Sequence, residues 1–159
     1  AGDSTGRGLR LNLLPDMWIW GLIAMDEAGG CYCGALRYRV SADPVSKAQC
    51  LCRECQYISG GGPNFFMIVP DAGFRYTKGT PQEFTRADLD APVTRQFCGT
   101  CGTHIATRKP GLAAAILKVG TLDDPTAYGG PKMAIFAVDQ QPFHVLADGL
   151  PTAERLPPR

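Results

Sequence analysis

Apolar and polar residues alternate along several short segments of the chain, which is the pattern of half-buried strands. The clearest case is residues 36–40, where Leu, Tyr and Val alternate with two arginines. Residues 65–69 form a continuous apolar run that ends at Pro70, as expected of a more deeply buried strand. We predict further strands at residues 74–76, 83–85, 93–97, 102–107 and 133–138.

One apolar run, residues 113–119, fits either a strand or a short helix. Gly111 and Gly120 bound it so closely that a strand is the better prediction. Glycine (19) and proline (13) together make about a fifth of the 159 residues, which favours short strands joined by tight turns. The length suits one hydrophobic core rather than two. We therefore predict one mainly β domain at residues 28–150, followed by a proline-rich C-terminal tail at residues 151–159.

Residues 1–27 do not share this pattern. Arg7 and Arg10 precede an apolar run at residues 17–25, an arrangement that resembles a signal peptide. Pro15 and Asp16 interrupt the apolar character, and a run of about nine residues is too short to span a bilayer. We interpret residues 1–27 as an N-terminal extension outside the core, with Met25 as a natural start.

The charge distribution excludes two classes of partner. The composition is 45% hydrophobic and 19% charged, which is typical of a globular chain. The formal net charge is +1 and no basic block occurs, so the chain lacks the electrostatic signature of a protein that binds nucleic acid or an anionic membrane. We expect neither as a partner.

The seven cysteines fall into three groups: Cys31 with Cys33, Cys50 with Cys52 and Cys55, and Cys98 with Cys101. Their odd number and close spacing disfavour disulfides within these groups. Clustered cysteines in a reducing compartment are typical of metal ligands or redox centres. We therefore expect a metal-binding protein of the cytoplasm.

The spacing of the cysteines indicates two zinc sites. Zinc favours four tetrahedral ligands, and thiolates are its usual donors in structural sites. A C-x-x-C turn and an extended C-x-C pair each offer two sulfurs on one side, which predicts a structural zinc on Cys31, Cys33, Cys98 and Cys101. Cys50, Cys52 and Cys55 then remain as three ligands with one open position, the usual layout of a catalytic zinc.

A second partition of the cysteines is a zinc ribbon made of Cys52 and Cys55 with Cys98 and Cys101. The 42 residues between these two pairs exceed the usual spacing of about 15–20. A zinc ribbon of this kind would also leave the Cys31-x-Cys33 pair without a metal to bind. His104 follows the last pair and could reach a metal, although a closed four-cysteine site leaves it no position, and we expect a structural histidine.

Residues directly after the central cysteines are candidates for substrate binding. Gln56 follows Cys55, and Ser59 and Gly60 begin a glycine-rich loop. Hydroxyl and backbone donors at this place could bind an oxyanion or a peptide carboxylate. The alternative is structural: Gln56 caps the loop, and the residues from Ser59 onward form a plain turn.

Three segments of the sequence resemble the glutathione-dependent formaldehyde-activating enzyme family, also called the centromere-protein-V family. They are residues 30–38, 50–56 and 97–103, with later similarity at 119–125 and 148–151. The resemblance implies a small β-tent fold of stacked antiparallel sheets. It also implies a structural zinc on Cys31, Cys33, Cys98 and Cys101 and a second zinc on Cys50, Cys52 and Cys55, in agreement with the spacing.

The resemblance further implies an activity, namely a carbon–sulfur lyase that condenses glutathione with formaldehyde to S-hydroxymethylglutathione. The expected partner is thus a small-molecule thiol such as glutathione, and the cofactor is zinc, two ions per chain. The alternative is a non-catalytic, zinc-stabilised module that binds a protein partner. A fourth protein ligand at the central cysteines, for instance His104, would favour the module.

Overall fold

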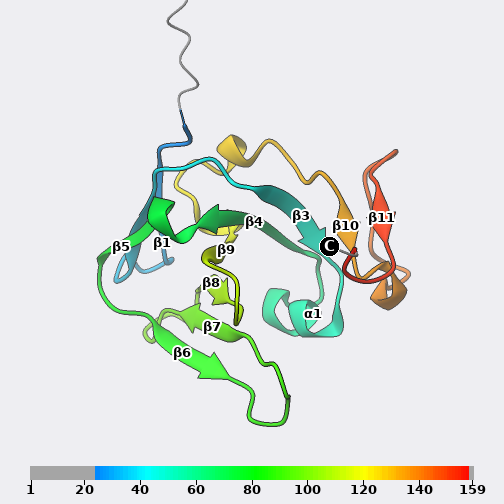
Figure 1. The fold of residues 1–159 in the computed structure, drawn as a ribbon, viewed down its shortest axis with the longest axis horizontal. Helices are drawn as coiled ribbons and strands as arrows, with labels where there is room; N and C mark the ends of the chain where they lie inside the picture. The colour runs from blue at the N-terminus through cyan, green and yellow to red at the C-terminus, as the bar shows by residue number, and fades with distance from the viewer. Residues whose placement is uncertain (1–23, 158–159) are drawn as a thin grey trace, which may run out of the picture.

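A computed structural model describes residues 24–157 of the chain (Figure 1). The predicted N-terminal extension lies almost entirely outside this range. The strands are β1 (Glu27–Gly30), β2 (Arg37–Val40), β3 (Ser46–Cys50), β4 (Asn64–Pro70), β5 (Phe74–Lys78), β6 (Gln82–Thr85), β7 (Thr94–Phe97), β8 (His104–Arg108), β9 (Ala114–Lys118), β10 (Ala134–Ile135) and β11 (Thr152–Ala153). The helices are α1 (Arg53–Ser59) and four 3₁₀ turns, η1 (Asp71–Gly73), η2 (Val119–Thr121), η3 (Pro125–Tyr128) and η4 (Ala137–Asp139).

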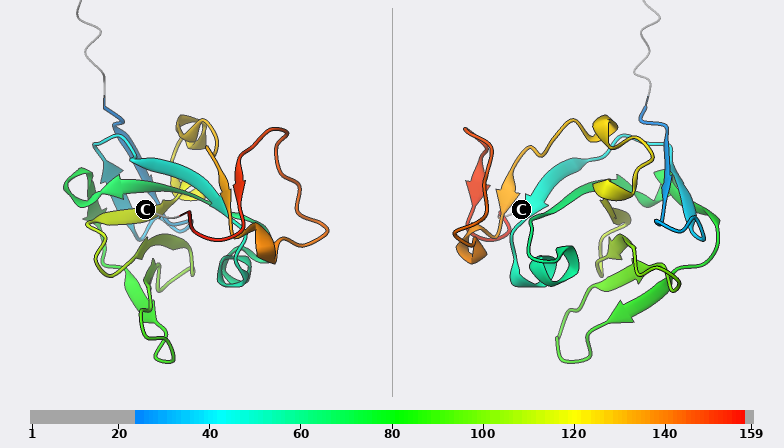
Figure 2. Two further views of the ribbon diagram at one scale, coloured as in Figure 1. Left: turned by 45° about the vertical axis from the view of Figure 1, so that its right-hand side comes forward. Right: turned by 180° about the vertical axis from the view of Figure 1, so that it is seen from behind.

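These strands form two sheets. The smaller has the order β1-β2-β5 and is antiparallel throughout, and the larger has the order β11-β10-β3-β4-β9-β8-β7-β6. Within the larger sheet β10 runs parallel to both β3 and β11, and the other pairs are antiparallel. Figure 2 shows the β1–β2 hairpin and the short β10–β11 pair at opposite sides of the molecule. The predicted fold class, a mainly β protein built from antiparallel sheets, is confirmed.

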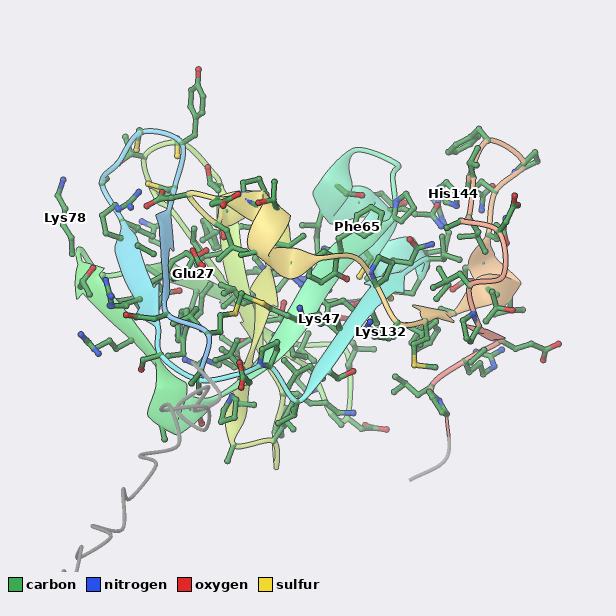
Figure 3. All side chains as sticks on the ribbon, turned by 90° about the horizontal axis from the view of Figure 1, so that it is seen from above. Glu27, Lys47, Phe65, Lys78, Lys132 and His144 are labelled. Carbon is green, nitrogen blue, oxygen red and sulfur yellow. The ribbon has the colours of Figure 1, made fainter. Side chains whose placement is uncertain are left out.

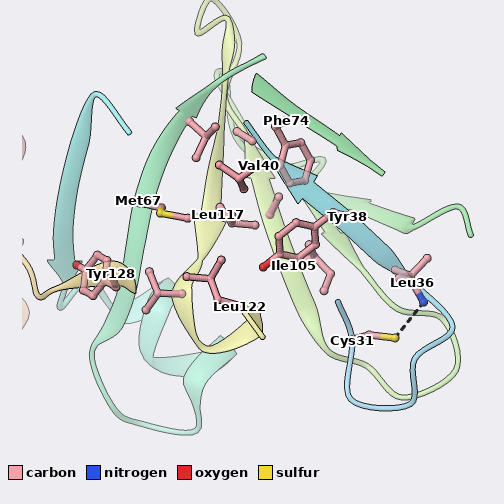
Figure 4. Packing of buried hydrophobic residues seen from close by; sticks show 14 of the residues in the cluster. Cys31, Leu36, Tyr38, Val40, Met67, Phe74, Ile105, Leu117, Leu122 and Tyr128 are labelled. Carbon is pink, nitrogen blue, oxygen red and sulfur yellow. Dashed lines mark hydrogen bonds between the residues drawn. The ribbon is translucent and has the colours of Figure 1, made fainter. Parts of the chain in front are cut away.

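One face of the large sheet packs against the small sheet. Met67 on β4 and Leu117 on β9 are fully buried there, and they meet Tyr38, Val40 and Phe74 from the small sheet (Figure 4). Successive side chains of a strand point to opposite faces, so the neighbours of Met67 and Leu117 in sequence must point away from this core. The main hydrophobic core therefore occupies only one side of the large sheet.

The opposite face of the large sheet carries a second, smaller cluster. Phe66 lies opposite Ala48 of β3 and also opposite Lys118 of β9, so the three side chains share one face. Cys50 and Ile135 pack with Phe66 and Ala48 in this cluster. Helix α1 lies beside the same region, next to β4 (Figure 1). The central cysteines thus lie on the face that the main core does not use.

A glycine of β1 allows the small sheet to approach η2 closely. A Cβ added to Gly29 would lie 2.2 Å from the Tyr38 hydroxyl oxygen and 2.4 Å from the carbonyl oxygen of Thr121. The Tyr38 hydroxyl is itself hydrogen-bonded to Thr121 Oγ1 over 2.8 Å. No side chain fits at residue 29 without displacing backbone.

The segments predicted as strands at 36–40, 65–69, 74–76, 83–85, 93–97, 102–107 and 113–119 correspond to β2, β4, β5, β6, β7, β8 and β9. The strand predicted at 133–138 is wrong beyond Ile135. Phe136 adopts a left-handed conformation, with φ of 58°, and η4 follows it directly. Strand β11 lies within the residues predicted as a tail. No helix of the described residues combines the length and the apolar character that crossing a membrane requires.

Candidate metal centres and the adjoining cavity

Two turns bring the first four-cysteine group together. Cys31 and Cys33 lie in the turn after β1, and Cys98 and Cys101 lie in the turn between β7 and β8. The four sulfur atoms all lie within 4.8 Å of one another. Cys33 Sγ is 3.5 Å from Cys31 Sγ and 3.7 Å from Cys98 Sγ. The group therefore joins the start of the small sheet to the β7–β8 turn, near the β6 edge of the large sheet.

Hydrogen bonds hold two of these sulfurs in place. The Leu36 N–H donates to Cys31 Sγ over 3.1 Å (Figure 4). On the other turn Thr103 Oγ1 lies 3.2 Å from Cys101 Sγ and accepts a hydrogen bond from the Tyr32 N–H over 3.2 Å. Such contacts orient the ligands of a metal and tune their basicity.

The geometry of this group fits zinc. A disulfide would need a sulfur–sulfur distance of about 2.0 Å, and all seven cysteines are free. Zinc–sulfur bonds of about 2.3 Å in a tetrahedron place the sulfurs about 3.8 Å apart. The observed separations of 3.5 and 3.7 Å are close to that value. Cys31 and Cys98 are also buried, as in a closed structural site.

The three-cysteine group lies where β3 ends and α1 begins. Cys50 is the last residue of β3, Cys52 is the N-cap of α1, and Cys55 lies in its first turn. Their sulfur atoms lie within 4.8 Å of one another. The Cys55 N–H donates to Cys52 Sγ over 3.4 Å, so the helix start orients the sulfur of Cys52 inward to the group. The grouping of the seven cysteines is that of the predicted partition, not that of the zinc ribbon.

The electrostatics of this group also suit a cation. Hydrogen bonds from the thiols of Cys50 and Cys55 lower the pKa of Cys52, whereas the neighbouring Cys52 sulfur raises the pKa of Cys50. One thiolate thus forms readily, but three adjacent thiolates repel one another. A divalent metal removes that repulsion, because it favours the deprotonated form of every ligand.

Among the described residues no histidine or carboxylate completes the three-cysteine group. His104, the predicted alternative ligand, donates from Nε2 to the Ala106 carbonyl oxygen over 3.0 Å. Burial lowers the pKa of His104 to about 3, so the ring is neutral. Its Nδ1 is buried and has no hydrogen-bond partner in the described part of the chain.

The predicted substrate-binding residues differ in accessibility. Gln56 is 2% exposed, and its amide donates to the Leu51 carbonyl oxygen over 2.6 Å and to that of Asp139 over 2.9 Å. Ser59 is exposed, and its hydroxyl donates to the Cys55 carbonyl oxygen over 3.0 Å. Gly60 is also exposed and ends α1 in the left-handed conformation. Ser59 and Gly60 therefore face solvent, whereas Gln56 fixes the loop that carries the cysteines.

A cavity of about 510 Å³ opens over the three-cysteine group. Strands β3, β4, β7, β8, β9 and β10 contribute to it, together with α1, several loops and residues near the C-terminus. Its apolar lining consists of Ile58, Phe66, Ile68, Ala91, Val93, Leu112, Ile116, Ile135, Phe136, Leu156 and Pro157. The sulfurs thus lie in an apolar recess rather than on an open surface.

A lysine from β9 lies in this cavity, and the sequence alone did not indicate it. The Lys118 ammonium lies over the Phe66 ring, 5.9 Å from its centroid. No carboxylate of residues 24–157 forms an ion pair with it. Burial lowers the pKa of Lys118 to about 8, and the nearby cysteines, Cys55 first, oppose that shift. The three-cysteine group therefore has a cation beside it that is not neutralised by an acidic residue.

A second charged arrangement fixes α1 to the β6–β7 hairpin. Glu54, between two of the cysteines, accepts hydrogen bonds from Arg95 over 2.5 Å and from Arg86 over 2.9 Å. The Arg95 side chain is only 12% exposed, so this ion pair is better shielded from water than an ordinary surface pair. It positions the helix that carries Cys52 and Cys55 relative to the wall of the cavity.

Three comparisons place the chain among known proteins. The profile of the family described as glutathione-dependent formaldehyde-activating enzyme matches residues 26–139. A Halomonas elongata protein with the provisional name glutathione-dependent formaldehyde-activating enzyme is 32% identical over 82 residues, which cover 48% of this chain and 52% of that protein. The chain thus spans about half the length of this curated relative. A crystal structure of a Rhodobacter sphaeroides protein shares the fold, with a TM-score of 0.52 and 18% identity over 65% of this chain and 96% of that one.

Proposed function

Because the chain belongs to the glutathione-dependent formaldehyde-activating enzyme family, we propose that it is a zinc-dependent carbon–sulfur lyase. It would form or cleave an adduct between a thiol and a carbonyl compound, such as S-hydroxymethylglutathione. The observation that carries this proposal is the cavity in which Cys50, Cys52 and Cys55 lie beside the unpaired cation of Lys118. No fourth ligand from the described residues closes the group, which favours a reactive centre over a purely structural one.

The catalytic group consists of Cys50, Cys52 and Cys55. A zinc ion held by these three sulfurs would bind an incoming thiol as the thiolate and keep it nucleophilic at neutral pH. The contribution of the chain is geometric: β3 fixes Cys50, and the start of α1 fixes the other two. Gln56 supports this loop from inside, since its amide is bonded to Leu51 and Asp139.

Lys118 is suited to act on the carbonyl component of the reaction. When the thiol sulfur adds to the carbonyl carbon, a C–S bond forms and the π electrons of the carbonyl group move to its oxygen. An ammonium group at this place stabilises the negative charge on the oxygen and can donate a proton to it. The proton lost by the thiol replaces it, so atoms and charges balance without an oxidant or reductant. Cleavage is the same sequence in reverse.

Ser59 and Gly60 remain predicted contacts for the peptide part of a thiol such as glutathione. Both are exposed at the end of α1, one turn after the last cysteine of the group. The Ser59 hydroxyl lies within hydrogen-bond distance of the backbone carbonyl oxygens of Cys55 and Gly62, and its one proton is shared between them. Its oxygen keeps two lone pairs, which can accept a hydrogen bond from a donor of the substrate.

The test is a direct measurement of adduct formation. Protein with a verified zinc content is mixed with glutathione and formaldehyde, and the exchange between free and S-hydroxymethylated glutathione is followed by NMR. We expect exchange faster than the spontaneous reaction, and loss of that acceleration in Cys52→Ser. Zinc-loaded protein that leaves the spontaneous rate unchanged would overturn the proposal.

A further inference from the structure

The cavity over the three-cysteine group is far larger than formaldehyde requires. Its volume of about 510 Å³ lies in the range of pockets that enclose whole small molecules, about 300–1,000 Å³. A one-carbon aldehyde would occupy only the region next to the sulfurs. The remaining space must be filled by another part of the adduct or by water.

The walls of that remaining space are mainly apolar, although Thr107 and Lys109 also contribute to them. Ile68 and Ile116 lie on adjacent strands, directly paired, and Phe66 and Ile135 pack with Cys50 in the same cluster. Helix α1 adds Ile58, and further apolar residues come from the loops. Water gains little from such walls, whereas an apolar group gains in proportion to the area it buries.

The polar groups of the cavity do not match the charges of glutathione. Its two carboxylates need cationic partners, but Arg95 is already bonded to Glu54, and that carboxylate would repel them. Lys109 also lines the cavity, but it offers a single positive charge for two carboxylates. Lys118 lies against Phe66 beside the sulfurs, where the reacting atoms are expected. The enclosed part of the cavity is therefore better suited to the carbonyl component than to the peptide body of the thiol.

We infer that the carbonyl substrate of this site carries an apolar substituent of several carbons, an alkyl chain or an aromatic ring. The substituent lies between Ile68, Ile116 and Phe66, and the carbonyl oxygen faces Lys118. This inference rests on the proposed function and specifies its substrate class. The reaction is unchanged: the C–S bond forms, the carbonyl electron pair moves to oxygen, and that oxygen gains the proton which the thiol loses.

The first test compares aldehydes of increasing length with zinc-loaded protein and glutathione. Formaldehyde, propanal, hexanal and benzaldehyde are used, and kcat/KM for adduct formation is measured by NMR exchange. Burial of each methylene should raise kcat/KM about fourfold until the cavity is filled. Acceleration with formaldehyde and none with the longer aldehydes overturns the inference and leaves the proposed function intact. Without acceleration for any aldehyde, both fail.

The second test reports binding without activity. Isoleucine δ1 methyl groups are labelled and hexanal is added. Ile58, Ile68, Ile116 and Ile135 line the cavity, and their signals should shift. Ile105 is fully buried in the other core and is the internal reference. Shifts at Ile105 alone, or at none of the five, overturn the inference.

A pair of variants connects binding to the cavity itself. Leu112 lines the cavity from a loop, so Leu112→Trp should fill part of it without disturbing a strand. We expect about a tenfold loss of kcat/KM for hexanal and a much smaller loss for formaldehyde. Leu89→Trp is the matched control, because Leu89 is 42% exposed and is not part of the lining. Equal effects of Leu112→Trp on both aldehydes contradict the inference.

Discussion

The imidazole of His144 donates from Nε2 to the carbonyl oxygen of Gly61 over 2.7 Å, although the two residues are 83 positions apart. The other ring nitrogen accepts from the Gln141 N–H over 3.1 Å. His144 is 6% exposed and lies on the loop that follows η4 (Figure 3). This histidine thus connects the C-terminal part of the chain to the loop at the end of α1, close to the three-cysteine group.

Replacing His144 with alanine should loosen that loop. The partly buried carbonyl of Gly61 loses its partner, which costs about 1 kcal/mol in the free energy of unfolding. We also expect zinc to leave the three-cysteine site faster, with release from the four-cysteine site unchanged. Urea unfolding and a chromogenic chelator measure the two effects. Val145→Ala is the control, since Val145 is 88% exposed; equal zinc release from both variants would count against this role.

The two cysteine groups should differ in their importance for folding. Structural zinc contributes about 10–16 kcal/mol in small peptides, as much as the whole stability of a domain, about 5–15 kcal/mol. We expect two zinc ions per chain, no folded protein from Cys98→Ser, and a folded protein with one zinc from Cys52→Ser. Elemental analysis and circular dichroism test this. A folded Cys98→Ser protein would show that the four-cysteine site is not structural.

Lys118→Met should separate activity from stability. The variant removes a buried cation without an acidic partner, so the free energy of unfolding should stay the same or increase. The rate of adduct formation should fall about 100-fold, mainly in kcat, as for the loss of an oxyanion donor. Lys118→Arg should restore part of the rate. Lys132→Met is the control for an exposed lysine, and a similar rate loss in that variant would refute the assignment.

Gly29→Ala should destabilise the small sheet. The added methyl group would overlap the Tyr38 hydroxyl and the Thr121 carbonyl group, and overpacking of this kind costs about 1–3 kcal/mol. Gly120→Ala is the matched control, because no atom lies within 4 Å of a Cβ at that position. Thermal unfolding of both variants is the measurement, and equal melting temperatures would contradict the close approach.

His104 should make the fold sensitive to acid. Burial lowers its pKa to about 3 in the native state, against about 6.5 in an unfolded chain. The unfolded chain therefore binds more protons between these values, and stability falls as the pH is lowered through that range. We expect a neutral ring at pH 5 by NMR and a weaker pH dependence of unfolding in His104→Gln. A midpoint near pH 6.5 in the folded protein would disprove the burial effect.

The sequence predicted the elements whose side chains alternate or form apolar runs. Strand β2 shows the alternation, and strand β4 is the continuous apolar run. Strand β3 was not predicted, because Ser46–Cys50 contains no β-branched or aromatic residue, and its burial comes from its central position in the sheet. Helix α1 was also missed: seven residues are too few to show a helical period, and its N-cap is a cysteine.

The grouping of the cysteines was predictable because each pair is local in sequence. The surroundings were not, since they come from distant strands. Lys118 lies 63 residues after Cys55 and one residue before the end of an apolar run. A lysine in that position is expected to be exposed to solvent. The ion pair of Glu54 with Arg95 and the bond from His144 to Gly61 likewise depend on tertiary packing. Local spacing thus identifies the candidate ligands, whereas the fold determines what lies around them.

Strand β9 presents Leu117 to the main core and Lys118 to the cavity, so adjacent residues serve opposite sides of one sheet. Deleting or inserting a single residue within Ala114–Lys118 would exchange those sides and bury the ammonium group in the hydrocarbon interior. Changes of length in the turn before this strand would leave the alternation of its side chains between the two faces unchanged. Insertions and deletions should therefore be tolerated at residues 109–113, whereas those within Ala114–Lys118 should prevent folding.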